Sequence, residues 1–311
     1  MIPISTKLSY ASSLITDMER GKSALLTFGK PGHILKRKIA ITGFISRLML
    51  FLIFNPIALF RAKYNPSVWH RRRTAAIKLA CFLFPFDTKG HELAPSKRGQ
   101  VFVINHPTLN DPLCAIVYAL DLYPGHEIVV PVNLPWFESI CRYRSKLLKI
   151  GVNIIPILTP ETAKRLGSEN QISSIQTALM SNYITEFTKA LANGGIPVVA
   201  QQATRQRYIF LDPAQAESGD GILSTISLIL VGIRRAKLLE QTDIVPVGVI
   251  PHSLHAKSRL NPFCKYMLNI GEPILATNLS AVKNAAKRPA DLFILQRLAE
   301  LLPAEYRFAK E

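Results

Sequence analysis

The sequence predicts an α/β domain with a mainly parallel, mixed sheet flanked by helices, preceded by a helical N-terminal region that associates with a membrane. Two observations predict the domain: short apolar segments alternate with helix-length segments after about residue 90, and no internal repeat or low-complexity stretch interrupts the 311 residues. A third predicts the region before it, because the first quarter of the chain combines the most apolar run with most of the net charge. The expected division is 1–90 for the N-terminal region and 91–311 for the α/β domain.

Six short apolar segments are the expected strands, and five longer segments between or after them are the expected helices. The strands are expected at 100–104, 127–132, 152–158, 196–201, 244–250 and 266–270, and the helices at 112–122, 135–149, 172–193, 223–239 and 291–302. Connections of helix length allow neighbouring strands to run parallel. The run Asn193-Gly194-Gly195 is typical of a helix stop and predicts the end of the longest helix.

The most apolar run of the chain, Ile39 to Phe60, is just long enough to span a membrane, for which about 20 residues are needed. Pro56 would break or kink such a helix. Basic residues stand on both sides, at 36–38 and 61–73, whereas positive charge normally gathers on the cytoplasmic side alone. With the shorter apolar piece at 75–86, the run therefore favours a monotopic, interfacial anchor on the cytoplasmic face. A spanning helix and a core helix hairpin remain the alternatives.

The charge distribution favours an anionic lipid surface as a partner. The chain has a net charge of +17 and a positive mean hydropathy of +0.18. Residues 1–73 hold thirteen Lys and Arg against two acidic residues, which places +11 of the +17 there. Nucleic acid is disfavoured as a partner because aromatic residues are not interleaved with the basic ones. Four scattered cysteines without metal-ligand spacing indicate reduced thiols in a cytosolic setting.

The segment Val101 to Leu113 carries the residues best suited to chemistry. An apolar strand ends at Ile104, His106 follows on the turn, and Asp111 stands five positions later. Pro112 suits the first position of a helix, which makes Asp111 the expected N-cap. A loop folded in this way lets the carboxylate reach one imidazole nitrogen while the other faces outwards. Such a pair can act as a general base on an alcohol. From the spacing alone, a helix cap beside a solvated histidine is the alternative.

The wider context of this segment resembles the glycerol-phosphate and lysophosphatidate acyltransferase family. NHPTLNDP is similar to the family's first block, Asn-His-x-Ser/Thr-x-x-Asp, with Asn105, His106, Thr108 and Asp111 matching. Four further segments resemble later parts of the family in the family's order, at 134–157, 190–206, 244–250 and 269–274. The resemblance covers about residues 90 to 275.

Two later blocks depart from the family's pattern. In the third block, Phe-Pro-Glu-Gly-Thr-Arg-Ser, Thr204 and Arg205 match, but Gln202 and Ala203 replace the Glu and the Gly. The second block usually ends in an arginine that helps to hold the acceptor's phosphate, and Ile157 stands at that place. The reaction type implied by the first block is unaffected by these changes, whereas the identity of the acceptor is open.

The resemblance implies an acyltransferase of phospholipid biosynthesis, with acyl-CoA or acyl carrier protein as donor and lysophosphatidate or a related glycerol-phosphate lipid as acceptor. His106 would be the general base and Asp111 its partner. A planar guanidinium can hold a phosphate with two hydrogen bonds, so Arg205 is the candidate anion ligand. Arg207 could supplement it, and Lys164 or Arg165 are less favoured.

The full set of expected substrate-binding residues is Asn105, Thr108, Thr204, Arg205 and Arg207. No metal or bound cofactor is expected. Two alternatives remain open: a catalytically silent, membrane-binding or lipid-binding protein of the same fold, and an acyltransferase for another acceptor, such as glycerol 3-phosphate or another lysolipid.

Overall fold

The computed structural model describes residue 77 and residues 86–94, 99–106, 111–123, 125–159, 162–163, 169–201, 225–251, 266–282 and 289–307. The apolar run expected to seat the chain on a membrane lies outside the described residues. Within the described ranges, no helix combines the length and the apolar character that crossing a membrane would need.

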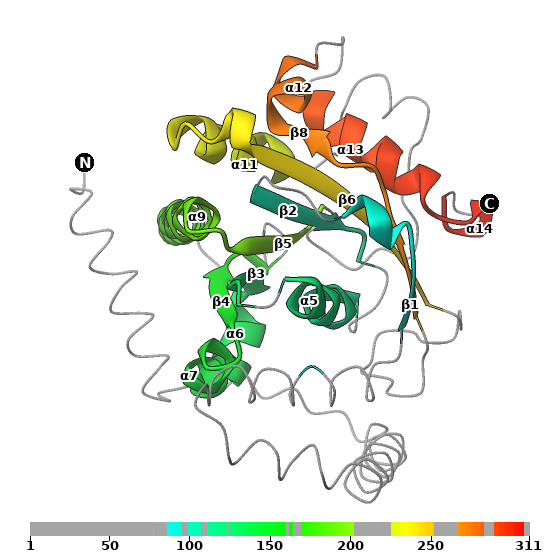
Figure 1. The fold of residues 1–311 in the computed structure, drawn as a ribbon. Coiled ribbons are helices and arrows are strands. Elements are labelled where there is room, and N and C mark those ends of the chain that lie inside the picture. The colour runs from blue at the N-terminus through cyan, green and yellow to red at the C-terminus, as the bar shows by residue number, and fades with distance from the viewer. Residues whose placement is uncertain are drawn as a thin grey trace, which may run out of the picture.

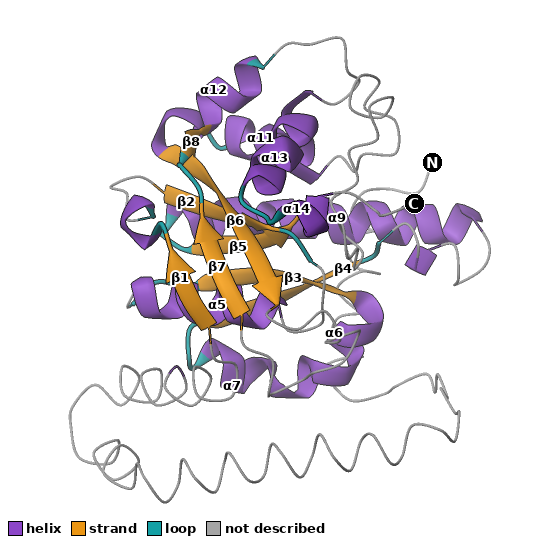
Figure 2. Ribbon diagram, turned by 90° about the vertical axis from the view of Figure 1, so that its right-hand side faces the viewer, coloured by secondary structure: helices purple, strands orange, loops and turns teal. Residues whose placement is uncertain are grey.

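The centre of the molecule is an eight-stranded sheet in the described part of the chain (Figure 2). Its strands are β1 (Phe86–Lys89), β2 (Gly99–Ile104), β3 (Ile128–Asn133), β4 (Val152–Ile157), β5 (Ile196–Ala200), β6 (Thr242–Pro251), β7 (Tyr266–Ile270) and β8 (Ile274–Leu275). The order is β1-β7-β6-β2-β5-β3-β4, with β8 paired to β6. β6 runs antiparallel to β7 and β8, and the other pairs are parallel. The predicted mainly parallel, mixed sheet is confirmed.

All six predicted strands are present, with ends within two residues of the predicted ones. The sequence missed β1 and β8. β8 has only two residues, too few for a pattern, and β1 lacks an apolar pattern because three of its four residues are exposed. β1 pairs with β7 from Phe86↔Tyr266 to Lys89↔Asn269. The sheet therefore includes residues of the expected N-terminal region, 1–90.

The described helices are α5 (Asp111–Leu122), α6 (Leu134–Ile140), α7 (Arg144–Leu148), α9 (Glu169–Ala192), α11 (Thr225–Arg235), α12 (Ala276–Ala281), α13 (Pro289–Glu300) and α14 (Ala304–Arg307), with 3-10 turns η2 (His91–Leu93), η3 (Cys141–Tyr143) and η4 (Leu239–Gln241). The single helix expected over 135–149 is wrong, because η3 separates α6 from α7. At Ile140, the last residue of α6, φ is −114° and ψ is −9°, away from the ideal helical angles. Phe137 before the break and Cys141 at its start are both buried against the sheet.

The predicted end of the longest helix is confirmed. α9 stops at Ala192, and Gly194 adopts a φ of +77°, which favours glycine. The amide N–H of Gly195 donates to the carbonyl of Ala190 at 2.7 Å, which satisfies one of the helix's last carbonyl groups.

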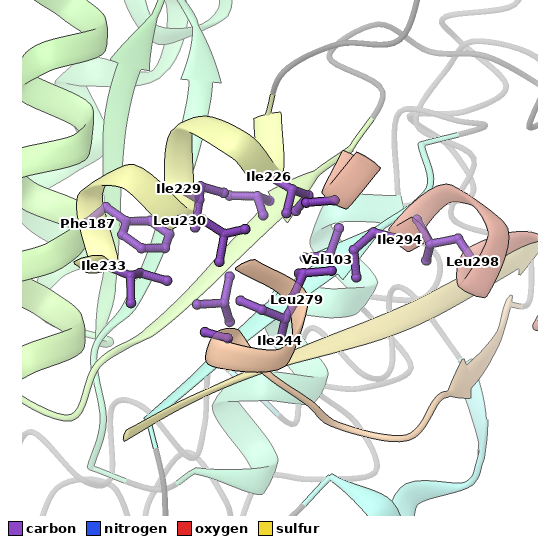
Figure 3. Close-up of a cluster of buried hydrophobic side chains, with 14 of the residues drawn as sticks. Val103, Phe187, Ile226, Ile229, Leu230, Ile233, Ile244, Leu279, Ile294 and Leu298 are labelled. Carbon is purple, nitrogen blue, oxygen red and sulfur yellow. The ribbon is translucent and has the colours of Figure 1, made fainter. Parts of the chain in front are cut away.

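Helices cover the sheet on both faces (Figure 1). On β2, Val101 and Val103 face the layer of α9, α11 and α13, whereas Phe102 and Ile104 face α5 and α6. Figure 3 shows the first of these cores, where α11 and α13 side chains meet Val103 from the sheet. Successive side chains of β2 are therefore buried on opposite faces, and the strand is apolar at nearly every position, as in a parallel sheet between two helical layers.

Adjacent parallel strands bring the segments that carry the predicted site residues to one edge of the sheet. β2 lies between β6 and β5, and Ile104 is level with Ala200 on β5. The segments that begin at Asn105 and at Gln201 therefore leave neighbouring strands side by side. In open α/β sheets, sites are found at the carboxyl ends of the strands.

Candidate active site

His106 lies at the carboxyl edge of the sheet, two residues beyond the end of β2, and is half-buried. Asp111 is the first residue of α5, so a helix begins where the predicted cap placed it, within the one or two residues by which helix ends are defined. The pairing of the two side chains stays a prediction. Thr108, Thr204, Arg205 and Arg207 lie outside the described residues.

Asn105 is buried, with 3% of its surface exposed, and its amide is bonded to β6. The side-chain N–H donates to the carbonyl of Val249 on β6 at 2.9 Å, and the side-chain oxygen accepts from the N–H of Val249 at 2.6 Å. The amide therefore forms a two-point bridge from the turn after β2 to β6. The resemblance implies a role for Asn105 in substrate binding. In the structure its amide makes contacts within the fold, and these contacts fix the backbone next to His106.

Gln201 continues the adjacent strand and is buried. Its backbone N–H donates to the carbonyl of Ile104 at 3.0 Å, which extends the β2–β5 pairing by one bond. Its side-chain N–H donates to a carboxylate oxygen of Asp291 at 3.0 Å. The start of the segment that carries Thr204 and Arg205 is thus held both to the histidine-bearing strand and to α13.

Asp291 is a fully buried carboxylate that the sequence analysis did not single out. Besides Gln201, it accepts hydrogen bonds from the N–H of Ile226 at 2.7 Å, the N–H of Ser227 at 3.1 Å and the hydroxyl of Ser227. It therefore satisfies free N–H groups at the start of α11 and places a negative charge at the positive end of that helix. In the sequence it appears as an acidic residue in the first turn of its own helix, and no local pattern reveals a contact with another helix.

The end of the second block is occupied by neutral groups. Ile157, at the place of the family's arginine, pairs with Asn133 across β3 and β4. The side-chain N–H of Asn133 donates to the hydroxyl oxygen of Thr162 at 2.8 Å, and the hydroxyl of Thr159 lies 3.0 Å from the same oxygen. An amide and two hydroxyls thus stand together at the carboxyl edge, two strands away from His106. These residues were missed, since a threonine-rich turn has no distinctive pattern.

No family model matches the amino-acid sequence, and the comparison with curated proteins finds no match. A solved structure is similar in fold: the crystal structure of the 1-acyl-sn-glycerophosphate (LPA) acyltransferase PlsC from Thermotoga maritima. The likeness covers 89% of this chain and 99% of that chain, with a TM-score of 0.50 and 15% sequence identity. The chain therefore has the fold of a glycerophospholipid acyltransferase, as the sequence resemblance implied.

Proposed function

We propose that the chain is an acyltransferase that moves a fatty acyl group from acyl-CoA or acyl carrier protein to the hydroxyl of lysophosphatidate or a related glycerol-phosphate lipid. The observation that carries the proposal is the position of His106. It follows a central parallel strand, within an Asn-His-x-Thr-x-x-Asp pattern, at the edge where sites form in such sheets. The shared fold supports it.

In the proposed reaction, the imidazole of His106 takes the proton from the acceptor hydroxyl as that oxygen attacks the thioester carbonyl carbon. Asp111 stabilises the imidazolium that forms. The tetrahedral intermediate collapses with cleavage of the carbon–sulfur bond, and the thiolate leaves with the proton from the imidazolium. A general base of this kind contributes roughly 10²–10⁴-fold. Arg205 is proposed to hold the acceptor's phosphate through two hydrogen bonds, with Arg207 as a second positive charge.

We further propose that the protein works at the cytoplasmic face of a membrane as a monotopic protein. Besides the N-terminal region, the connection from β3 to β4 (residues 134–151), which contains α6, η3 and α7, supports this. Trp136, Tyr143 and Leu148 are 47%, 42% and 42% exposed there. Aromatic side chains with an apolar body and a polar tip, such as those of Trp136 and Tyr143, suit the interface between water and lipid. Trp136 stands in the first turn of α6, directly after β3, and thus close to the carboxyl edge of the sheet.

The same connection is basic. Arg142, Lys146 and Lys149 are exposed on it. The guanidinium of Arg142 and the ammonium of Lys146 lie 4.8 Å and 5.7 Å from the centre of the Tyr143 ring. Glu138 is the one acidic residue of α6 and α7, and burial raises the pKa of its carboxyl group. A basic surface with exposed aromatic groups is complementary to a bilayer containing anionic phospholipid.

The reaction is tested by acyl transfer from labelled acyl-CoA and acyl carrier protein to lysophosphatidate and glycerol 3-phosphate in detergent micelles. The wild type is expected to transfer acyl groups, and His106→Ala is expected to lower kcat by roughly 10²–10⁴-fold. His126→Ala is the matched control, since His126 precedes β3 at the opposite edge of the sheet. A folded wild type that acylates neither acceptor would contradict the proposal, and retained vesicle binding would then favour a silent lipid-binding protein.

The membrane surface is tested by sedimentation of the full chain with vesicles of phosphatidylcholine, with and without phosphatidylserine. A basic residue near an anionic surface contributes about 1 kcal/mol, so Arg142→Gln combined with Lys146→Gln is expected to weaken binding about 30-fold. Arg234→Gln combined with Arg235→Gln neutralises two exposed charges on α11 and is the control. Equal losses in the two double variants would mean that net charge, rather than this surface, controls binding.

A further inference from the structure

The amide of Asn105 stands directly before His106, and the proposed mechanism gives it no part. The side chain is 3% exposed, and both its nitrogen and its oxygen are bonded to one residue of the fold, Val249 on β6. A substrate ligand directs its polar atoms at the substrate. An amide that is buried and bonded in this way is suited to holding the protein itself.

The amide of Asn105 continues the pairing of β2 with β6 beyond the last backbone pair. Figure 1 shows the two strands side by side, and their register ends at Ile104↔Val247. Val249 stands two residues further along β6. In a continued parallel ladder, its N–H and carbonyl groups would be bound by the backbone of residues 105 and 107. The side chain of Asn105 binds both groups instead, so a side-chain amide takes the place of backbone groups at the end of the strand.

The sequence explains why a side-chain donor is needed there. The residue after His106 is Pro107, and proline has no backbone N–H to donate to the carbonyl of Val249. Val249 is fully buried, and a buried carbonyl without a donor is costly. The side-chain N–H of Asn105 supplies the donor at 2.9 Å. The chain can therefore leave the sheet after β2 while β6 keeps its hydrogen bonds.

The strands on either side of this point are themselves held. β6 continues to Pro251 and stays paired with β7 over that length. The hydroxyl of Tyr306 on α14 donates to the carbonyl of Pro251 at 3.0 Å. On the other side of β2, the carbonyl of Ile104 accepts from the N–H of Gln201 at 3.0 Å. The two residues before His106 are therefore bonded to both neighbouring strands.

From this geometry, we propose that Asn105 is a positioning residue for His106 and not a ligand of the acceptor. By binding Val249, its side chain sets where the backbone of His106 leaves the sheet, and thereby where the imidazole stands. This inference rests on the proposed function of His106 as general base. Such a base must lie about 2.6–3.2 Å from the atom whose proton it takes. A misplacement of about 1 Å can cost about 10²-fold in rate.

The kinetic test separates a positioning residue from a substrate ligand. Asn105→Leu keeps the approximate shape of the side chain and adds no charge, but loses both bonds to Val249. For the full chain in micelles, kcat per folded protein is expected to fall about 10²-fold, with the KM values for lysophosphatidate and acyl-CoA unchanged. An unchanged kcat, with or without a higher KM for lysophosphatidate, would overturn the inference.

The matched control is Gln100→Leu, near the opposite end of the same strand. The amide of Gln100 is also buried, and its N–H donates to the carbonyl of Ala94. That carbonyl also accepts from the hydroxyl of Tyr123 at 2.8 Å, so it keeps a donor in the variant. Gln100→Leu is expected to leave kcat and both KM values unchanged, with the folded fraction of each variant measured by circular dichroism. An equal fall of kcat in this control would overturn the positioning role, because a general disturbance of β2 would explain both results.

A second readout does not depend on acyl transfer. The imidazole C–H signals are recorded by NMR with isotope-labelled histidine, and the signal of His106 is identified by its loss in His106→Ala. In Asn105→Leu, the His106 signal is expected to shift, and that of His126, which precedes β3 at the opposite edge of the sheet, is expected to stay. Gln100→Leu is expected to leave the His106 signal in place.

The two readouts distinguish failure of the inference from failure of the proposed function. If the wild type transfers no acyl group but the His106 signal shifts in Asn105→Leu, the proposed function fails, while the control of His106 by Asn105 stands. An unchanged His106 signal in Asn105→Leu would overturn the inference. Should Asn105→Leu not fold, Asn105→Gln provides the same comparison. It keeps a donor and an acceptor but places them one methylene further from the backbone, so a smaller fall in kcat is expected.

Discussion

Two connections leave the sheet side by side and are held in place in different ways. Residues 105–110 link β2 to α5, and residues 201–224 link β5 to α11. Their strands end level with each other, at Ile104 and Ala200. The first connection is short and is tied at its start to β6 by the amide of Asn105. The second is long, and both of its ends are bound by Asp291, which stands 90 residues beyond Gln201 in the chain.

The difference shows how the length of a connection changes the way its ends are held. A connection of a few residues follows the two elements that it joins, and one side chain at its start is enough to orient it. A longer connection has more conformations to lose, so it needs a contact from elsewhere in the fold. On this basis, substitutions in the first connection should act on the whole fold, whereas substitutions around the second should act mainly on substrate binding.

The largest effect is expected for Asn105→Leu. Leucine leaves both the N–H and the carbonyl of Val249 buried without their partner, at about 1–3 kcal/mol for each group. The free energy of unfolding is therefore expected to fall by about 2–6 kcal/mol, measured by urea denaturation. Gln201→Leu removes one donor from the carboxylate of Asp291, which keeps three others. The free energy of unfolding is therefore expected to fall by only about 1 kcal/mol. Equal losses in the two variants would remove the distinction between the connections.

A smaller effect, confined to substrate binding, is expected for Arg205→Ala in the second connection. Loss of hydrogen bonds to a charged phosphate costs about 1.5–3 kcal/mol, so the KM for lysophosphatidate is expected to rise about 10–100-fold. Arg205→Lys keeps the positive charge but loses the planar guanidinium, so its KM for lysophosphatidate should lie between those of the wild type and Arg205→Ala. Unfolding by urea should be unchanged. A fall in kcat at constant KM would instead place Arg205 in transition-state stabilisation.

The smallest effect is expected for Gly232→Ala on α11, the helix that follows the second connection. An added methyl group would lie 2.7 Å from a γ-methyl of Ile184 on α9, closer than packed carbon atoms allow. Overpacking of this kind costs about 1–3 kcal/mol, which urea denaturation would detect. Ile184→Ala removes the opposing methyl group, so the double variant should be more stable than the sum of the two single changes predicts. If the losses of stability in the two single variants simply add in the double variant, the added methyl group does not clash with Ile184.

The sheet could be predicted from the sequence because apolar strands and their helical connections leave a periodic signal. Such a signal was absent for β1, whose residues are largely exposed, and for the break at Ile140. The first connection was recognisable because His106 and Asp111 lie within one short motif. Asp291 was not, since a carboxylate in the first turn of a helix is ordinarily a cap for that helix. Its contact with α11 arises from the packing of two helices, which one sequence does not display.

β1 and β4 are the two edge strands of the seven-strand order, so the distance between them is the width of the sheet. At about 4.8 Å per strand, the two edges are separated by about 29 Å. The chain enters the sheet through β1, and the basic aromatic connection that includes Trp136 leads into β4. Attachment to a bilayer through both edges would restrict rolling of the protein about the strand direction. A fixed tilt would hold the edge that carries His106 at a constant height above the lipid. A lipid acceptor would then reach that edge by diffusion within the plane of the membrane.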